Sequence, residues 1–262
     1  MPHWRAILAY DGTPYHGWQV QPGLITVQGT LAEALLALTG ETVLPQGSGR
    51  TDTGVHALGQ VVSFPLNAKI PASNLLFALN RVLPPSIRVL SVAEAAPGFH
   101  ARHSAVRKTY EYRILPRITA LETICPPFLA PYVWASPRAL SLDLLNEAAA
   151  HVVGTHDFSS FAAVNPDQAH RNASPVLPKE NTRTLFASYW VQDPGPEGLL
   201  RYRVTGSGFL HHMVRNLVGT FVEAGSERLP ASQIPAILAA RDRSAAGPTA
   251  PARGLFLHEV EY

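Results

Sequence analysis

The chain has 262 residues, of which 46% are hydrophobic and 15% are charged, a composition that is typical of globular proteins and excludes a disordered chain. Its single cysteine, Cys125, excludes an intrachain disulfide and any zinc site built from several cysteines. The formal net charge of +2 does not by itself indicate a nucleic-acid-binding protein.

The kind of basic residue is more informative than the net charge. Only three of the 21 basic residues are lysines, and the others are arginines. Arginine makes paired hydrogen bonds to phosphate and stacks on bases, so this bias suits an RNA-binding protein. A GC-rich genome would produce the same bias, and composition does not separate the two explanations.

No apolar run approaches the roughly 20 residues that a membrane-spanning helix needs. The best candidate, residues 31–38, is short and contains Glu33. Residues 1–5 lead directly into a strand-like segment, so we expect no signal peptide. These patterns predict a cytoplasmic protein with no membrane partner.

The N-terminal half alternates strands and helices. Strands are expected at residues 5–10, 60–66 and 87–92, and helices at residues 29–38 and 71–80. The first helix is expected to end at Gly40. This order is typical of an α+β unit with an antiparallel sheet.

The C-terminal half begins with a long strand in which Tyr110 and Tyr112 share one face. Strands are expected at residues 106–115, 184–192, 200–205 and 255–261, and helices at residues 141–153, 209–223 and 232–240. The fold class is therefore α+β, with two related domains, residues 1–105 and 106–262, each having an antiparallel sheet flanked by helices. Residues 164–180 are expected to have the weakest order because they contain several turn-forming residues.

The most informative segment is residues 49–57, which read GRTDTGVHA. Two glycines, which permit tight turns, bracket Arg50 and Asp52, and small hydroxyl residues lie between them. Such a loop presents a guanidinium and a carboxylate to the same small volume. Asp52 is therefore a candidate nucleophile or general base, although a polar turn with a structural aspartate would show the same pattern.

Residues 49–57 resemble the signature of the TruA family of tRNA pseudouridine synthases, in which the aspartate at the position of Asp52 is catalytic. Four further segments are similar to motifs of that family and occur in the same order along the chain: residues 10–19 with 26–31, 99–105 with 108–112, 208–216, and 246–255. The resemblance therefore extends over the whole chain.

The resemblance implies a pseudouridine synthase-like fold and an isomerase that converts uridine to pseudouridine at positions 38–40 in the anticodon stem-loop of tRNA. The reaction has no redox change and no group donor, so no cofactor, nucleotide or metal is expected. Asp52 would act as the nucleophile, or as a base at C2′ of the ribose, and the sequence does not separate these two roles.

The resemblance implies catalytic roles for Tyr110 and Arg215 as well. It matches Tyr110 to the tyrosine whose ring lies against the target base, although the pattern alone favours core packing. It matches Arg215, on the predicted helix, to the arginine that pairs with the catalytic aspartate. Arg215 lies four residues after His211 and among apolar neighbours, so it needs a carboxylate or phosphate partner. His211 and His212 are not expected to bind a metal, because adjacent residues point to different faces of a helix.

The remaining candidates are residues that would contact the RNA, and for each of them a structural role is equally compatible with the pattern: Trp18, Arg50, Thr51, Arg102, Lys108 and Leu255. The resemblance also implies a homodimer in which both subunits contact one tRNA. A positively charged cleft between subunits would explain how a chain with a net charge of +2 binds RNA.

Two other classes of protein stay open from the residues themselves. A non-catalytic RNA-binding protein or RNA chaperone on the same scaffold would bind RNA whether or not Asp52 is present. A glycoside-cleaving enzyme would need a second carboxylate as its acid. In the Tyr110 and Arg215 motifs the acidic residue is Glu111, which alternates to the strand face opposite Tyr110.

Overall fold

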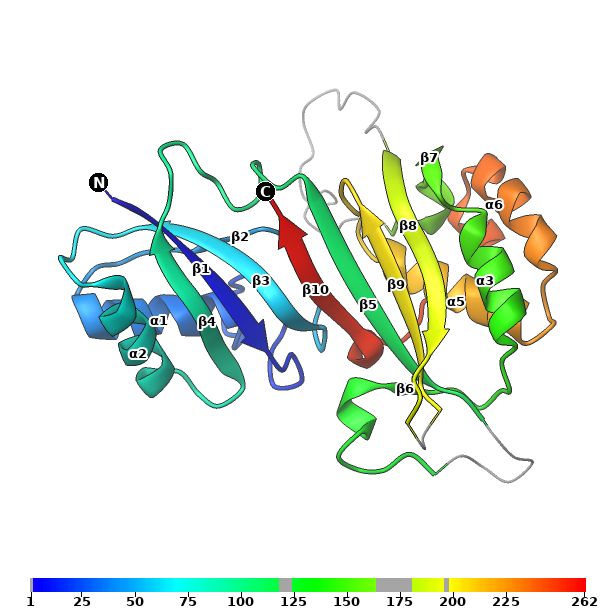
Figure 1. The fold of residues 1–262 in the computed structure, drawn as a ribbon, viewed down its shortest axis with the longest axis horizontal. Coiled ribbons are helices and arrows are strands. Elements are labelled where there is room, and N and C mark those ends of the chain that lie inside the picture. Colours follow the sequence, from blue (N-terminus) through cyan, green and yellow to red (C-terminus); the bar gives the residue numbers. More distant parts are fainter. Residues whose placement is uncertain (1, 118–123, 164–180, 196–197) are drawn as a thin grey trace. The chain divides into compact units, whose positions relative to one another are not determined.

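The computed structural model describes residues 2–117, 124–163, 181–195 and 198–262 (Figure 1). The predicted fold class is confirmed: the fold is mixed α+β, and its strands pair mostly in antiparallel fashion. Residues 164–180, for which the sequence predicts the weakest order, lie outside the described residues. In the described part of the chain, no helix combines the length and the apolar character that crossing a membrane requires.

The chain divides into two compact units. One contains Met1–Thr109 and Leu255–Tyr262, and the other contains Tyr110–Gly254. The division falls inside one long strand, and the last strand of the chain returns to the first unit. The predicted boundary between residues 105 and 106 instead leaves that last strand with the second half, because the pairing that returns it joins residues far apart in sequence.

The first unit contains two helices and a sheet in which β1 lies between β4 and β3 and is antiparallel to both. The short strand β2 pairs with β3, and β10 pairs with β3 in parallel. The elements are β1 (His3–Tyr10), α1 (Val27–Thr39), β2 (Gln46–Gly47), β3 (His56–Pro65), α2 (Ala72–Val82), β4 (Ile87–Glu94) and β10 (Leu255–Glu261).

Local sequence explains why these elements form where they do. The side chain of Thr26 accepts a hydrogen bond from the backbone N–H of Gly29 and caps the start of α1. The helix ends at Gly40, whose φ of 73° is left-handed, as the sequence predicts. In β1 every second residue from Trp4 to Tyr10 is buried, so one face of this strand lies in the core. Helix α2 packs against β4 and α1 (Figure 1).

The second unit has a sheet in the order β5, β9, β8 and β7, with β6 paired to β5. Its strands and α-helices are β5 (Arg107–Leu115), β6 (Trp134–Ala135), α3 (Leu142–Ala150), β7 (Gly154–Asp157), β8 (Thr182–Gln192), β9 (Leu200–Gly206), α5 (Met213–Gly225) and α6 (Ile234–Ala240). Its short 3-10 helices are η1 (Ala130–Tyr132), η2 (Ser159–Phe161), η3 (Ala231–Gln233), η4 (Arg243–Ala245) and η5 (Ala252–Gly254). Helix α3 packs against both β8 and α5 (Figure 1).

Each predicted helix and strand has a counterpart in the structure, and most ends differ by a few residues. The largest shifts are at the starts of two elements: α5 begins at Met213 rather than at residue 209, and β3 begins at His56 rather than at residue 60. The strands β2, β6 and β7 are missing from the prediction. Strands of two to four residues are too short to show a period of two, so only their pairing partners define them.

Candidate active site

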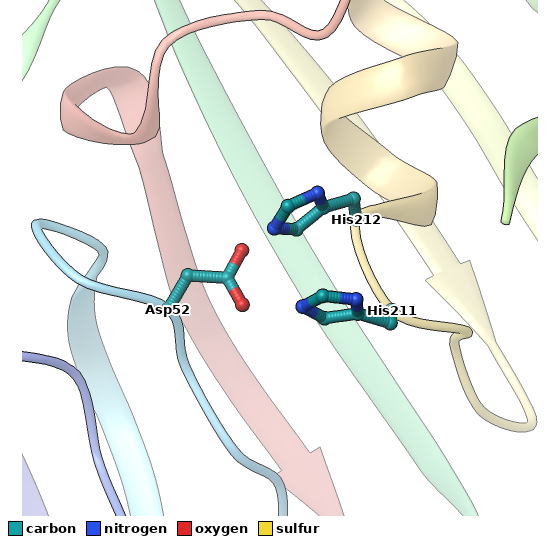
Figure 2. Close-up of side chains that lie close together, drawn as sticks. All are labelled: Asp52, His211 and His212. Atoms are coloured by element: carbon teal, nitrogen blue, oxygen red, sulfur yellow. The ribbon is translucent and has the colours of Figure 1, made fainter. Parts of the chain in front are cut away.

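The loop that carries Asp52 connects β2 to β3 in the first unit. The backbone N–H of Ser48 donates to Val61 O at 2.8 Å and extends the pairing of these strands by one residue before the chain leaves the sheet. The N–H of Val55 donates to Asp52 O at 3.1 Å and closes a turn that contains Gly54, with a left-handed φ of 75°. The half-buried side chain of Asp52 therefore projects from a tight turn that depends on a glycine (Figure 2).

The first of the other motifs lies against this loop. The hydroxyl groups of Tyr10 and Thr51 form a hydrogen bond of 2.9 Å. A Cβ atom on Gly12 would lie 2.0 Å from Val55 O, and one on Gly17 would lie 2.7 Å from Thr51 O. Both motif glycines are therefore needed because the two segments approach each other backbone to backbone.

Tyr110 lies on β5, in the second unit, and its side chain is 8% exposed. Its ring meets that of Phe209 edge to face, with 5.0 Å between the centroids and 79° between the planes. Tyr112 is fully buried, and its hydroxyl donates to Pro251 O at 2.7 Å. Burial raises the pKa of Tyr112 far above its ordinary value in spite of two nearby arginines, so this phenol stays neutral.

Arg215 lies on α5 with a half-buried side chain. Its Nε–H donates to Ala250 O at 2.8 Å, and the backbone N–H of Ala250 donates to Arg215 O at 3.1 Å. One turn further along the helix, a Cβ atom on Gly219 would lie 1.7 Å from Pro248 O. The segment 247–250 therefore lies directly along α5, and one of its carbonyls orients the guanidinium.

His211 and His212 precede α5 rather than lying within it. His212 has a left-handed φ of 59°, and the centroids of the two imidazole rings lie 3.9 Å apart, with 32° between the planes (Figure 2). The prediction that the two side chains point to different faces of a helix is therefore wrong, as is the placement of His211 one turn before Arg215 on that helix. Left-handed backbone is uncommon outside glycine, so the sequence pattern does not show it.

The predicted RNA contacts differ in exposure. The side chains of Arg50 and Arg102 are exposed. Trp18, Thr51 and Leu255 are 3%, 7% and 6% exposed and belong to the core of the first unit. The two arginines therefore reach the surface, whereas the other three residues shape the interior beneath it.

Lys108, another predicted RNA contact, is directed toward the Asp52 loop. It lies in the part of β5 that belongs to the first unit, and its Nζ donates to Ser48 O at 2.5 Å. Burial, together with the nearby charge of Arg102, lowers the pKa of Lys108 to about 8. The amine of Lys108 is thus hydrogen-bonded to the backbone carbonyl that lies just before the loop leaves the sheet.

Glu111, the carboxylate that a glycoside-cleaving enzyme would need, is engaged elsewhere in the second unit. It is 1% exposed and forms ion pairs with Arg113 at 2.7 Å and Arg203 at 3.0 Å. Burial would raise its pKa, but the hydrogen bonds and charges of Arg113, Arg201 and Arg203 outweigh burial and lower it. Glu111 therefore stays ionised at neutral pH and is poorly suited to act as a general acid.

Two buried polar residues on β3 are missing from the predicted site. The Nδ1 atom of His56 accepts a hydrogen bond from Gly12 N at 3.0 Å, and its ring stacks on Phe256 with 4.7 Å between centroids. Gln60 is fully buried and accepts a hydrogen bond from Ser48 Oγ. The signal that could have identified Gln60 is an amide beside a run of apolar residues in a strand, because a buried amide needs partners.

Comparison with known proteins identifies the family. A family model described as tRNA pseudouridine synthase matches residues 6–104 and 148–262. The tRNA pseudouridine synthase A of Solibacter usitatus is 47% identical over 98% of both chains. The protein of the same name from Moorella thermoacetica is 47% identical over the full length of both chains, and that of Bacillus subtilis is 39% identical over 98% of both.

The mixed α+β fold, the Asp52 loop and these matches together define the class of protein, an isomerase that makes pseudouridine in tRNA. Within that class, the chain belongs to the TruA family, tRNA pseudouridine synthase A. The resemblance seen in the sequence motifs is thereby confirmed.

Proposed function

We propose that the enzyme isomerises uridines at positions 38–40 in the anticodon stem-loop of tRNA, with Asp52 as its nucleophile. The observation that supports this role most is the construction of the Asp52 loop. The turn is closed by a hydrogen bond to Asp52 O, and its neighbour Thr51 is bonded to buried Tyr10. A loop backbone held in this way presents the carboxylate of Asp52 from a fixed position, which favours one geometry of attack.

The proposed reaction conserves all atoms of the nucleotide except for the exchange of one proton. The target base leaves its stack to reach the enzyme. The carboxylate of Asp52 attacks C1′ of the ribose as the N1–C1′ bond breaks. The uracil turns, its C5 bonds to C1′ as the carboxylate leaves, and C5 then loses its proton while N1 gains one. Removal of a C2′ proton by Asp52 is the alternative first step.

Tyr110 and Arg215 have supporting roles in this proposal. The ring of Tyr110 stacks on the uracil, and its phenol accepts the C5 proton in the last step. Arg215 pairs with the carboxylate of Asp52 and orients it. The edge-to-face contact of Tyr110 with Phe209, and the hydrogen bond from Arg215 to Ala250 O, support these roles because each limits the motion of the side chain.

The proposed substrate contacts follow from exposure. Arg50 and Arg102 bind phosphates of the tRNA, and Lys108 adds a positive charge beside the loop. Trp18, Thr51 and Leu255 shape the site from within the core. We further propose a homodimer with a positively charged cleft between subunits, which would concentrate the arginines of a chain whose net charge is only +2. The substrate implies action in the cytoplasm.

The experiment that tests this proposal is tritium release from tRNA labelled as [5-³H]uridine, with the wild type and Asp52→Asn compared. The C5 hydrogen must leave when C5 becomes the glycosidic carbon, so release reports the isomerisation itself. We expect release by the wild type, none by Asp52→Asn, and equal tRNA binding by both in a filter assay. Clear residual turnover by Asp52→Asn would refute the nucleophile assignment. A tRNA with uridine present only at positions 38–40 tests the proposed sites.

A further inference from the structure

We propose that Gln60 is a positioning residue for catalysis, because its buried side-chain amide sets the conformation of the loop that carries Asp52. This inference rests on the proposed role of Asp52 as nucleophile. Gln60 does not belong to the loop; it lies on β3, and its side chain is 0% exposed.

Both the oxygen and the nitrogen of the Gln60 amide form hydrogen bonds with residues at the start of the loop. Its Oε1 accepts a hydrogen bond from Ser48 Oγ at 2.7 Å, and its Nε2 donates to Gly49 O at 2.8 Å. These are consecutive residues at the point where the chain leaves the pairing of β2 with β3. One amide therefore determines the direction in which the loop departs from the sheet.

A third contact extends this network to the residue next to Asp52. The phenol of Tyr10 is hydrogen-bonded to Gln60 and also to Thr51 Oγ1, which lies 2.9 Å away. Burial raises the pKa of Tyr10 to about 12, in spite of its side-chain contacts with Thr51 and Gln60. The phenol therefore keeps its proton, and Gln60 and Thr51 are linked through a single buried hydroxyl.

Lys108 completes the support of the same segment. The carbonyl of Ser48 accepts from Lys108 Nζ, and the next carbonyl, that of Gly49, accepts from Gln60. Buried polar groups require hydrogen-bond partners. For these two successive carbonyls the partners are side chains rather than a neighbouring strand. If the amide is removed, the loop has to find other partners for Ser48 and Gly49. A shift of about 1 Å in a nucleophile can slow a reaction about 100-fold.

The chemistry of the amide provides a specific test. A glutamate at this position can accept from Ser48 Oγ only by placing its second carboxylate oxygen against the carbonyl oxygen of Gly49. When protonated, the same group donates to Gly49 O and reproduces the contacts of the amide with Ser48 and Gly49. The other titratable groups that face this segment are Tyr10 and Lys108, with Tyr262, whose hydroxyl donates to Ala101 O at 2.7 Å. The wild type shares them, so the ratio of variant to wild-type rate isolates the new carboxyl.

The matched control is Asn80, a part-buried amide of the same unit. Its Nδ2 donates to Leu76 O and Val89 O, and its Oδ1 accepts from Val89 N, so it joins α2 to β4. Asn80→Leu removes a comparable set of hydrogen bonds and is expected to lower the melting temperature. It should leave the rate of isomerisation unchanged, because none of its contacts reaches the Asp52 loop.

The experiment is single-turnover tritium release from [5-³H]uridine tRNA at saturating enzyme, below the melting temperature of every variant. We expect Gln60→Met to react about 10- to 100-fold more slowly than the wild type, with its affinity for tRNA unchanged. The rate of Gln60→Glu, divided by that of the wild type, should rise as the pH falls from 8 to 6, whereas the ratio for Gln60→Met should stay flat.

Three results would overturn the inference: Gln60→Met reacting as fast as the wild type, Asn80→Leu losing as much rate as Gln60→Met, or a flat pH profile for Gln60→Glu. If Gln60→Met does not fold, the Gln60→Glu profile decides alone. Asp52→Asn distinguishes this failure from that of the proposed function. An active Asp52→Asn refutes the nucleophile, whereas an inactive Asp52→Asn beside a fully active Gln60→Met refutes only the role of Gln60.

Discussion

Asp52 belongs to the first unit and Tyr110 and Arg215 to the second, and the two units hold these residues by different interactions. Asp52 lies on a loop that is fixed by hydrogen bonds from buried side chains, including Gln60 and Tyr10. Tyr110 and Arg215 lie on a strand and a helix, so regular backbone pairing and close packing fix them.

This difference indicates which property of the enzyme a mutation in each unit should change. Hydrogen bonds to a loop are directional, so a change of one atom type redirects the loop while the core stays intact. Packing against a helix is determined by volume, so an added methyl group disturbs it even when no polar contact is lost. Mutations near the site in the first unit should therefore change mainly the rate of isomerisation. Mutations in the second unit should change both that rate and the free energy of unfolding.

The largest effect we predict within the second unit is on chemistry alone. Tyr110→Phe keeps the ring and its contact with Phe209, so stability should change little. If the phenol accepts the C5 proton, the rate of tritium release should fall about 10²- to 10⁴-fold. A fall of less than tenfold would remove Tyr110 from proton transfer.

Overpacking of α5 should cost the most stability. A Cβ on Gly219 would lie 1.7 Å from Pro248 O, so Gly219→Ala forces the segment along the helix to move. We expect a loss of about 3 kcal/mol or more in the free energy of unfolding, measured by urea denaturation. Gly208→Ala is the control, because the nearest atoms to its Cβ would be those of Arg183, at 3.8 Å. Equal stability of the two variants would contradict this account of the packing.

A smaller loss of stability is expected at Arg215. Arg215→Ala removes the charged donor to Ala250 O and should lower the free energy of unfolding by about 1.5–3 kcal/mol. Arg215→Lys keeps the charge without the Nε–H, so it should recover little of either stability or activity. Thermal melts and tritium release on both variants check this. Full recovery by lysine would mean that charge alone is required.

The last effect is a pH dependence of stability in the first unit. The pKa of Lys108 is lowered from 10.5 to about 8 in the folded protein, so the unfolded chain binds more protons between these two values. The free energy of unfolding of the wild type, relative to that of Lys108→Met, should therefore rise as the pH rises from 8 to 10.5.

Urea denaturation of both proteins at several pH values measures this difference. Lys69→Met, at an exposed lysine of the same unit, corrects for the general loss of a positive charge. A difference that falls with rising pH would show that the folded protein stabilises the charged amine, contrary to the prediction.

Local patterns in the sequence were enough to predict the α+β fold class, the main strands and helices, and the Asp52 loop. Helix α1 ends at Gly40 and the loop turns tightly at Gly54, in each case because glycine adopts left-handed backbone easily. A glycine is visible in the sequence, so these features could be predicted from single residues. The family could be identified for the same reason, because its motifs are short runs in which neighbouring residues act together.

Tertiary structure alone decided what supports the site. The pairing of β10 with β3 and the hydrogen bond of Lys108 to Ser48 join residues distant in sequence. The left-handed backbone of His212 is a conformation that its residue type does not favour. Gln60 illustrates the physical reason. A buried amide in a strand needs hydrogen-bond partners, and this need can be read from the sequence. The folded chain alone determines the partners, because it brings Ser48, Gly49 and Tyr10 to Gln60.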